Sequence, residues 1–130
     1  MIIMNAENEI VEEKIVTSEP VEVEDGILFM GKKFPKELKW VFVLMKLKQR
    51  GYLLRYYWDI PGEGVKTSYY LSEWEMDRDT GDITPRMPDK VEVLEPDRFS
   101  GRLRVVKTIR MSRTFDPPLD QIDMLMNMNL

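Results

Sequence analysis

The side chains of this chain that could carry out chemistry are carboxylates, lysines, tyrosines and hydroxyls, because histidine and cysteine are both absent. Their absence excludes disulfides, thiolate nucleophiles, Cys/His zinc sites and Ser-His-Asp triads. Any remaining chemistry would rest on carboxylates, lysines or hydroxyls, with or without an oxygen-ligated cation. No such group is accompanied by a partner base or a cleft signal. The sequence therefore predicts a protein that is not an enzyme, with no catalytic residue, no metal and no cofactor.

The carboxylates nearest to a chemical pattern are Glu73, Glu75 and Asp77, which alternate along a predicted strand and would share one face. Their mutual repulsion would raise a pKa or attract a cation. Asp77, Asp79 and Gly81 also have the spacing of part of a cation-binding loop, but the distal glutamate of an EF-hand is missing. A tight turn needs the same residues, with aspartate to bond its own backbone and glycine for a positive φ. We expect a solvated acidic face followed by a turn.

Acidic and basic residues are segregated along the chain, although the formal net charge is only -4. Residues 7–25 and 73–82 are acidic, whereas residues 32–50 and 98–113 are basic. The two kinds of segment could pack together and neutralise each other, or a basic face could be kept for an anionic partner. The net negative charge lacks the basic signature of a nucleic-acid-binding protein, which favours neutralisation.

If the basic segments bind nucleic acid, the first candidates lie on a predicted strand at residues 102–111. Arg102, Arg104 and Arg110 would project from one face, and alternate side chains of a strand lie ~6.6 Å apart, close to the ~7 Å between phosphates. Tyrosines on nearby strands could stack on bases, although aromatic residues in strands usually fill the core. The candidate nucleic-acid-binding residues are Arg102, Arg104, Arg110, Lys46, Lys48, Arg50, Arg55 and Lys66.

One stretch resembles the recognition-helix end and the wing of PadR-type winged-helix regulators. Those proteins have a helix that ends in glycine, a strand, a glycine-containing tip and a Tyr-Tyr-x-Leu-Ser/Thr strand. The matching segments here are Leu47–Trp58 with its Gly51, Gly62-Glu63-Gly64, and Tyr69-Tyr70-Leu71-Ser72, in which one residue of the last motif is missing. The resemblance covers about 26 of the 130 residues. Residues 1–34 lack the pattern of the two further helices that a winged helix has upstream.

This resemblance implies a winged-helix-like hairpin at residues 52–76. Together with a basic strand at residues 102–113, it implies a regulator that binds nucleic acid.

The sequence as a whole predicts an α+β fold, with an antiparallel, hairpin-built sheet, one main helix at about residues 36–50 and a short C-terminal helix. Pro35 and Glu37 are typical of a helix start, and Gly51 is typical of a helix end. The apolar stripe of this helix is Leu38, Val41, Phe42 and Met45. Residues 41, 43, 45 and 47 also alternate as in a strand, but the capping signals favour the helix.

Strands are predicted at residues 21–24 and 27–30 around an Asp25-Gly26 turn, and at residues 52–60 and 65–76 around a turn at residues 61–64. Further strands are predicted at residues 91–94 and 102–111, where Val106 and Lys107 interrupt the alternation of apolar and polar residues. Residues 84–89 contain two prolines and are expected to be irregular. Residues 119–128 are predicted to be a helix whose apolar side is Leu119, Ile122, Leu125 and Met126.

Residues 1–20 are polar and acidic, and they are predicted to be loosely ordered, which leaves residues 21–130 as a single α+β domain. No run approaches the ~18–20 apolar residues that span a bilayer. The N-terminus turns acidic before any long apolar stretch forms, unlike a secretory signal. We therefore expect a cytoplasmic protein with no membrane partner. Scarce glutamine beside abundant Glu, Lys and Arg gives a thermophile-like composition.

The expected function is that of a small non-enzymatic interaction module that binds another macromolecule, with a protein favoured over nucleic acid as the partner. The C-terminus, residues 124–130, is rich in methionine, and methionine-rich surfaces adapt to partners, which predicts self-association through this segment. The competing interpretation is that the segment docks on its own domain. The alternative function is a nucleic-acid-binding regulator that uses the hairpin at residues 52–76 and the basic strand at residues 102–113.

Overall fold

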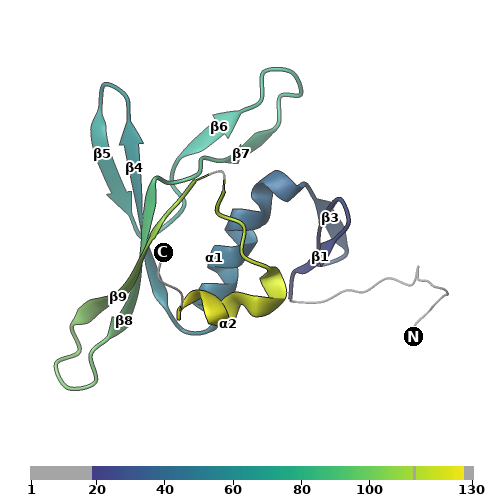
Figure 1. Ribbon diagram of the computed structural model, residues 1–130. Coiled ribbons are helices and arrows are strands. Elements are labelled where there is room, and N and C mark those ends of the chain that lie inside the picture. Colours follow the sequence, from purple (N-terminus) through teal and green to yellow (C-terminus); the bar gives the residue numbers. More distant parts are fainter. Residues whose placement is uncertain (1–18, 113, 128–130) are drawn as a thin grey trace. The chain divides into compact units, whose positions relative to one another are not determined.

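The computed structural model of the chain describes residues 19–112 and 114–127 (Figure 1). The chain divides into two compact units. Unit 1 comprises Met1–Lys46 and Pro117–Leu125, and unit 2 comprises Leu47–Asp116 and Met126–Leu130. The expected loose segment at residues 1–20 lies outside the described residues except for Glu19 and Pro20. The single domain over residues 21–130 stays a prediction.

The sheet of unit 1 is an antiparallel meander in the order β1-β2-β3. Its strands are β1 at Val21–Val23, β2 at Gly26–Phe29 and β3 at Lys32–Phe34. The predicted hairpin of the first two strands is confirmed, but its turn is Glu24-Asp25 instead of Asp25-Gly26, because Gly26 already pairs with Val23.

Glycine is required at position 26 because two strands lie very close together there, and not because the chain turns. A Cβ atom at this position would lie 2.4 Å from the carbonyl oxygen of Phe34, so any side chain there would push β2 and β3 apart. The third strand was missed by the sequence reasoning. It follows a two-residue turn, Met30-Gly31, in which both residues have a positive φ, 54° and 78°, as tight hairpins require.

The main helix is confirmed. A 3-10 turn, η1, spans Lys36–Leu38 after Pro35, and α1 spans Lys39–Gln49. Gly51 has a φ of 97°, and its N–H donates to the carbonyl of Lys48 at 2.9 Å, while the N–H of Tyr52 reaches the carbonyl of Leu47 at 3.4 Å. This pair of bonds closes a helix with a left-handed glycine, as the sequence indicated.

The meander of unit 1 packs on α1 through aromatic rings. The ring of Phe42 lies 5.5 Å from that of Phe29 and 5.2 Å from that of Phe34, centroid to centroid. Such tilted ring pairs add to the apolar area that is removed from water. Ile27 and Val43 are fully buried, which places the core of unit 1 between the meander and the helix.

Buried lysines of α1 tie the C-terminal segment to unit 1. Lys39 Nζ lies 2.8 Å from Glu22 Oε2, and Lys46 Nζ donates to the carbonyl of Leu119 at 2.8 Å. Glu22 Oε1 accepts the N–H of Leu119 at 2.9 Å. The C-terminal helix is confirmed in a shorter form, as η2 at Leu119–Gln121 and α2 at Ile122–Leu125. Leu119, Ile122 and Leu125 are buried as predicted, and Met128 lies outside the described residues.

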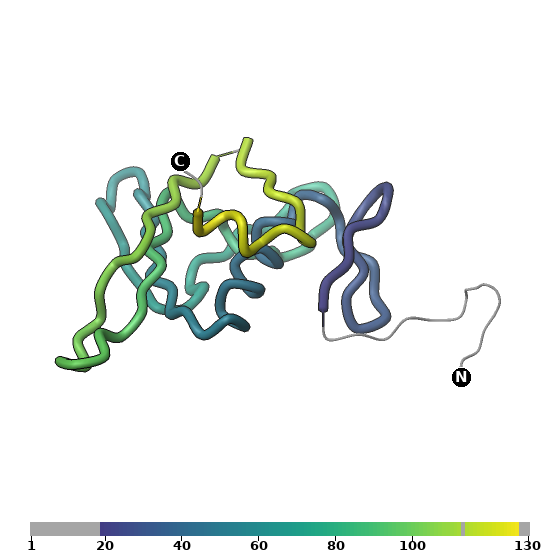
Figure 2. Tube along the Cα trace, turned by 60° about the horizontal axis from the view of Figure 1, so that its bottom comes forward, coloured from purple at the N-terminus to yellow at the C-terminus, as the bar shows by residue number. Residues whose placement is uncertain are grey.

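Unit 2 contains a four-stranded antiparallel sheet in the order β5-β4-β8-β9. Its strands are β4 at Leu53–Ile60, β5 at Gly64–Ser68, β8 at Lys90–Pro96 and β9 at Leu103–Arg110. One face of this sheet is buried and is formed by Leu54, Tyr56, Trp58, Val91, Val93 and Ile109. Figure 2 shows the β8–β9 hairpin extending as an arm from the sheet of unit 2.

The single strand predicted at residues 65–76 is wrong. β5 ends at Ser68, whose hydroxyl accepts the N–H of Tyr70 at 3.0 Å, a local bond that turns the chain away from the sheet. A new strand, β6 at Trp74–Met76, pairs with β7 at Ile83–Pro85 in a separate two-stranded sheet. β7 overlaps the segment 84–89 that was expected to be irregular, and Pro85 fits there because both strands of such a ribbon are edges.

The interrupted alternation in the last predicted strand is a β-bulge. Val93 pairs with Lys107 and Leu94 pairs with Val105, so Val106 is an extra residue on β9. A bulge of this kind shifts the side chains that follow it to the other face. The fold class is confirmed as α+β, but the described residues upstream of α1, 19–38, form three strands and a 3-10 turn where a winged helix has helices.

Candidate functional site

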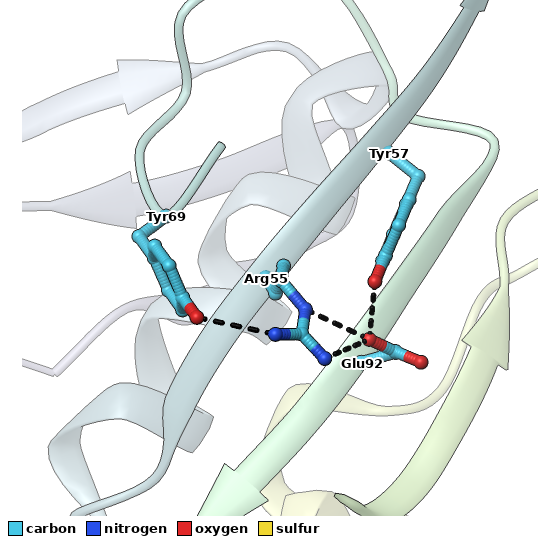
Figure 3. A network of polar contacts seen from close by, with 4 residues as sticks. All are labelled: Arg55, Tyr57, Tyr69 and Glu92. Carbon is cyan, nitrogen blue, oxygen red and sulfur yellow. Dashed lines mark hydrogen bonds and ion pairs between the residues drawn. The ribbon is translucent and has the colours of Figure 1, made fainter. Parts of the chain in front are cut away.

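The face of the unit 2 sheet opposite its core carries a polar network that joins β4, β8 and the segment after β5 (Figure 3). Arg55 pairs directly with Glu92 across the two strands, and its Nε and Nη2 donate to Glu92 Oε1 at 2.9 and 2.7 Å. The Tyr57 hydroxyl donates to the same oxygen at 2.5 Å. Arg55 Nη1 donates to the Tyr69 hydroxyl at 3.1 Å. Lys90 Nζ lies 4.2 Å from the centre of the Tyr57 ring.

The network holds Glu92, Tyr57 and Arg55 in their ordinary charge states at neutral pH. Hydrogen bonds from Tyr57 and Arg55 hold the pKa of Glu92 below its usual value, against the effect of burial. The bond to Glu92 raises the pKa of Tyr57, and the same carboxylate raises the pKa of Arg55. None of these groups is brought toward neutral pH, where an acid or base catalyst works best. The arrangement can orient two tyrosine rings and a guanidinium.

Replacing Glu92 by glutamine is expected to lower the free energy of unfolding by about 1–2 kcal/mol at pH 7, since a part-buried guanidinium loses its charged acceptor. The pKa of Glu92 is lowered by folding, so its stabilisation is present at neutral pH and is lost as the pH falls below about 4.5. The difference between the variant and the wild type should therefore be smaller at pH 3 than at pH 7. Urea denaturation at both pH values checks this, with Glu95→Gln as the control, because its pair with Arg104 is more exposed. Equal losses in the two variants would contradict the assignment.

The predicted nucleic-acid-binding residues do not form one surface. Arg104 pairs with Glu95 of β8 and Arg110 pairs with Lys90. Lys90 and Glu95 are an odd number of residues apart on one strand and project from opposite faces. The prediction that Arg102, Arg104 and Arg110 share a face is therefore wrong, and the bulge at Val106 is the cause.

The other five candidates are also divided. Arg55 lies on the open face of the unit 2 sheet, whereas Lys66 pairs with Trp58 on the opposite face and forms an ion pair with Glu73. Lys46 is buried in unit 1 against the carbonyl of Leu119. The remaining two, Lys48 and Arg50, are exposed at the end of α1.

A groove of about 530 Å³ in unit 2 brings two of the predicted residues together. It lies between the segment that follows α1 and the β8–β9 hairpin, and it is lined by Arg50, Gly51, Tyr52, Glu95, Pro96, Asp97, Arg98, Phe99 and Arg104. Arg98 and Phe99 were missed by the sequence reasoning. The Phe99 side chain is 97% exposed, which is unusual for an aromatic residue of a folded chain.

The turn that carries Phe99 is built in the same way as the turn of the β6–β7 hairpin. In each, an aspartate side chain, Asp77 or Asp97, accepts the backbone N–H groups two and three residues ahead, at 2.7–3.1 Å. In each, a glycine with positive φ, Gly81 or Gly101, donates to the carbonyl of that aspartate. The shared sequence, Asp-Arg-x-Ser/Thr-Gly, is the signal that could have identified both turns.

The turn expected at residues 77–83 is thus confirmed. In the part of the chain that the structure describes, no group of three or more acidic side chains is placed to hold a metal ion. Within the same residues, no helix is long and apolar enough to cross a membrane.

The β6–β7 ribbon has one apolar face. Trp74 pairs with Pro85, and Met76 pairs with Ile83, so these four side chains project from the same side. The side chains of Trp74, Met76 and Ile83 are 57, 64 and 65% exposed.

Comparison of the chain with protein-family models, with curated proteins and with solved structures finds no match.

Proposed function

We propose that this protein is a small non-enzymatic interaction module that binds another macromolecule, and that it self-associates through the apolar face of the β6–β7 ribbon. The observation that carries the proposal is the exposure of Trp74, Met76 and Ile83 on one side of a two-stranded sheet. Tryptophan and methionine are enriched in the buried centre of protein interfaces. Contiguous apolar surface of this kind is typical of a docking site for another protein.

The ribbon needs support that two strands do not provide by themselves. An isolated two-stranded hairpin is at best marginally stable in water, and it gains stability when its apolar face packs on another layer. A second copy of the ribbon offers the same apolar face, and symmetric pairing is the commonest way in which soluble proteins assemble. A dimer that pairs two ribbons would bury the apolar side chains of both, and no other part of the chain would need to take part.

The ribbon supports self-association better than the methionine-rich C-terminus does. Leu119, Ile122 and Leu125 are already buried, and among the described residues of α2 the exposed apolar side chain is Met124. Self-association through residues 124–130 stays a prediction, as does the cytoplasmic location.

The test is sedimentation velocity over a wide range of protein concentration. We expect the wild type to pass from monomer to dimer, and we expect Trp74→Ser with Met76→Ser to remain monomeric over the same range. Val65→Ser is the matched control, because Val65 is equally exposed, at 67%, but lies on β5. A wild type that is monomeric throughout, or a control that dissociates as the double variant does, would refute the ribbon interface.

A second candidate function is a nucleic-acid-binding regulator. The observation that favours it is the groove, where Arg50 and Arg104 line one cavity with Arg98 and Phe99. Arginine and aromatic side chains together are typical of surfaces that bind phosphates and unpaired bases.

A further inference from the structure

The exposure of Phe99 has no explanation in the fold of its own hairpin. The β6–β7 turn makes the same backbone and side-chain bonds with Asp79 at the equivalent position. The turn therefore works equally well with a polar residue there, and a phenyl ring that is 97% exposed adds nothing to it. The ring is therefore open to contact with a ligand, and a site there has to be argued from the groups around it.

Three arginines and two carboxylates line the groove beside Phe99. Arg98 and Arg102 flank the ring in the sequence and are exposed. The carboxylates nearby are engaged within the hairpin. Asp97 accepts the N–H groups of Phe99 and Ser100, which lowers its pKa, and Glu95 lies 2.5 Å from Arg104.

We propose that the tip of the β8–β9 hairpin and the adjoining groove bind single-stranded nucleic acid, with Phe99 stacked on a base and Arg98 and Arg102 on flanking phosphates. This inference rests on the second candidate function and is independent of self-association. The groove of about 530 Å³ lies in the size range of ligand sites, and Tyr52 and Arg104 line it beside Phe99. Bases that are paired and stacked in a duplex do not offer a free face to a ring, which favours a single strand.

The hairpin is well placed for this role. It extends as an arm from the sheet of unit 2 (Figure 2). Phe99 lies in the turn between β8 and β9. A strand of nucleic acid could then follow the groove toward Arg104. The β6–β7 turn has Asp79 and Asp82 at the positions where the β8–β9 turn has Phe99 and Arg102. The two turns therefore have the same backbone bonds and opposite net charge.

The experiment measures fluorescence anisotropy of labelled oligonucleotides of about 12 nucleotides, a length within the usual site size of such proteins. The probes are oligo-dT, oligo-rU and a DNA duplex, titrated with the full chain at about 50 to 200 mM salt. Phe99→Ala should weaken binding of the single strands by about 5- to 150-fold and leave the salt slope unchanged, because a stacked base is lost without a charge. Arg98→Ala should flatten the slope by about 0.7, the value for one phosphate of a single strand.

Arg78→Ala is the matched control, since Arg78 occupies in the β6–β7 turn the position of Arg98. It should bind as the wild type does, and thermal melting of all three variants should match that of the wild type. If both tip variants bind single strands as tightly as the wild type does, the site does not lie on this hairpin, although the protein still binds nucleic acid. A preference for the duplex would overturn the single-strand assignment. Failure of the wild type to bind any oligonucleotide would overturn the function and the site together. If anionic phosphatidylserine vesicles were then bound in its place and Phe99→Ala abolished that binding, the tip would belong to a lipid surface.

Discussion

Replacing Trp58 by alanine is expected to lower the free energy of unfolding by about 3–5 kcal/mol, the usual loss when a buried tryptophan is truncated. The Trp58 side chain is 1% exposed on the core face of the unit 2 sheet, with its ring 5.8 Å from that of Tyr56. Its indole nitrogen also donates to the carbonyl of Arg86 at 2.9 Å. The substitution therefore leaves a cavity and removes a hydrogen bond that holds the segment after β7 against the sheet.

Urea denaturation followed by circular dichroism measures this loss. Trp58→Phe separates the two contributions, because it keeps most of the ring but loses the donor, and it should cost about 1–2 kcal/mol. A loss below about 1 kcal/mol for the alanine variant would mean that Trp58 is not central to the core.

Replacing Val43 by proline is expected to destabilise the protein by about 3 kcal/mol or more. Val43 is fully buried in the middle of α1, where proline removes the N–H that the helix bonds to Lys39 and its ring collides with that carbonyl. Both units contain residues of α1, so the loss should reach the whole chain. Thermal melting followed by circular dichroism gives the magnitude.

Lys36→Pro is the control for this variant. Lys36 begins the first turn, where proline is tolerated, and Pro35 before it is already extended with ψ 154°. This variant should melt close to the wild type. Backbone chemical shifts of residues 38–48 in the wild type give an independent check, and strand-like shifts there would contradict the helix.

The features that the sequence predicted correctly are set by neighbours in the chain. Pro35 and Gly51 bound the main helix because each acts on the backbone next to it. Asp77 and Gly81 form their turn through bonds that span two to four residues. The hairpin at residues 21–30 was predicted correctly, but its turn was placed one residue too late. Gly26 is a strand residue that lies close to the carbonyl of Phe34, on a third strand that the sequence reasoning did not predict.

The features that the sequence did not predict depend on partners far away in the chain. β5 ends at Ser68 because the hydroxyl of Ser68 accepts a local hydrogen bond from Tyr70, which competes with continued strand pairing. The residue types alone do not show which of these two arrangements is more stable. Arg55 and Glu92 meet across 37 positions, and Lys46 reaches Leu119 across 73. For the candidate site, the arginines were predicted because of their charge. Phe99 was not predicted, because the residues next to it in the sequence do not show whether its ring is buried or exposed.

The extra residue at Val106 has a consequence for how the length of this strand could change. Arg104 and Arg110 are six positions apart on β9, yet they pair with Glu95 and Lys90, which are five positions apart on β8. Deleting Val106 would leave five positions between the two arginines, so a regular strand would still place them on opposite faces, with Arg104 opposite Glu95. The bulge therefore takes up one residue of chain length without moving a cation from one surface of the sheet to the other. A deletion at this position should leave the charge of both surfaces unchanged.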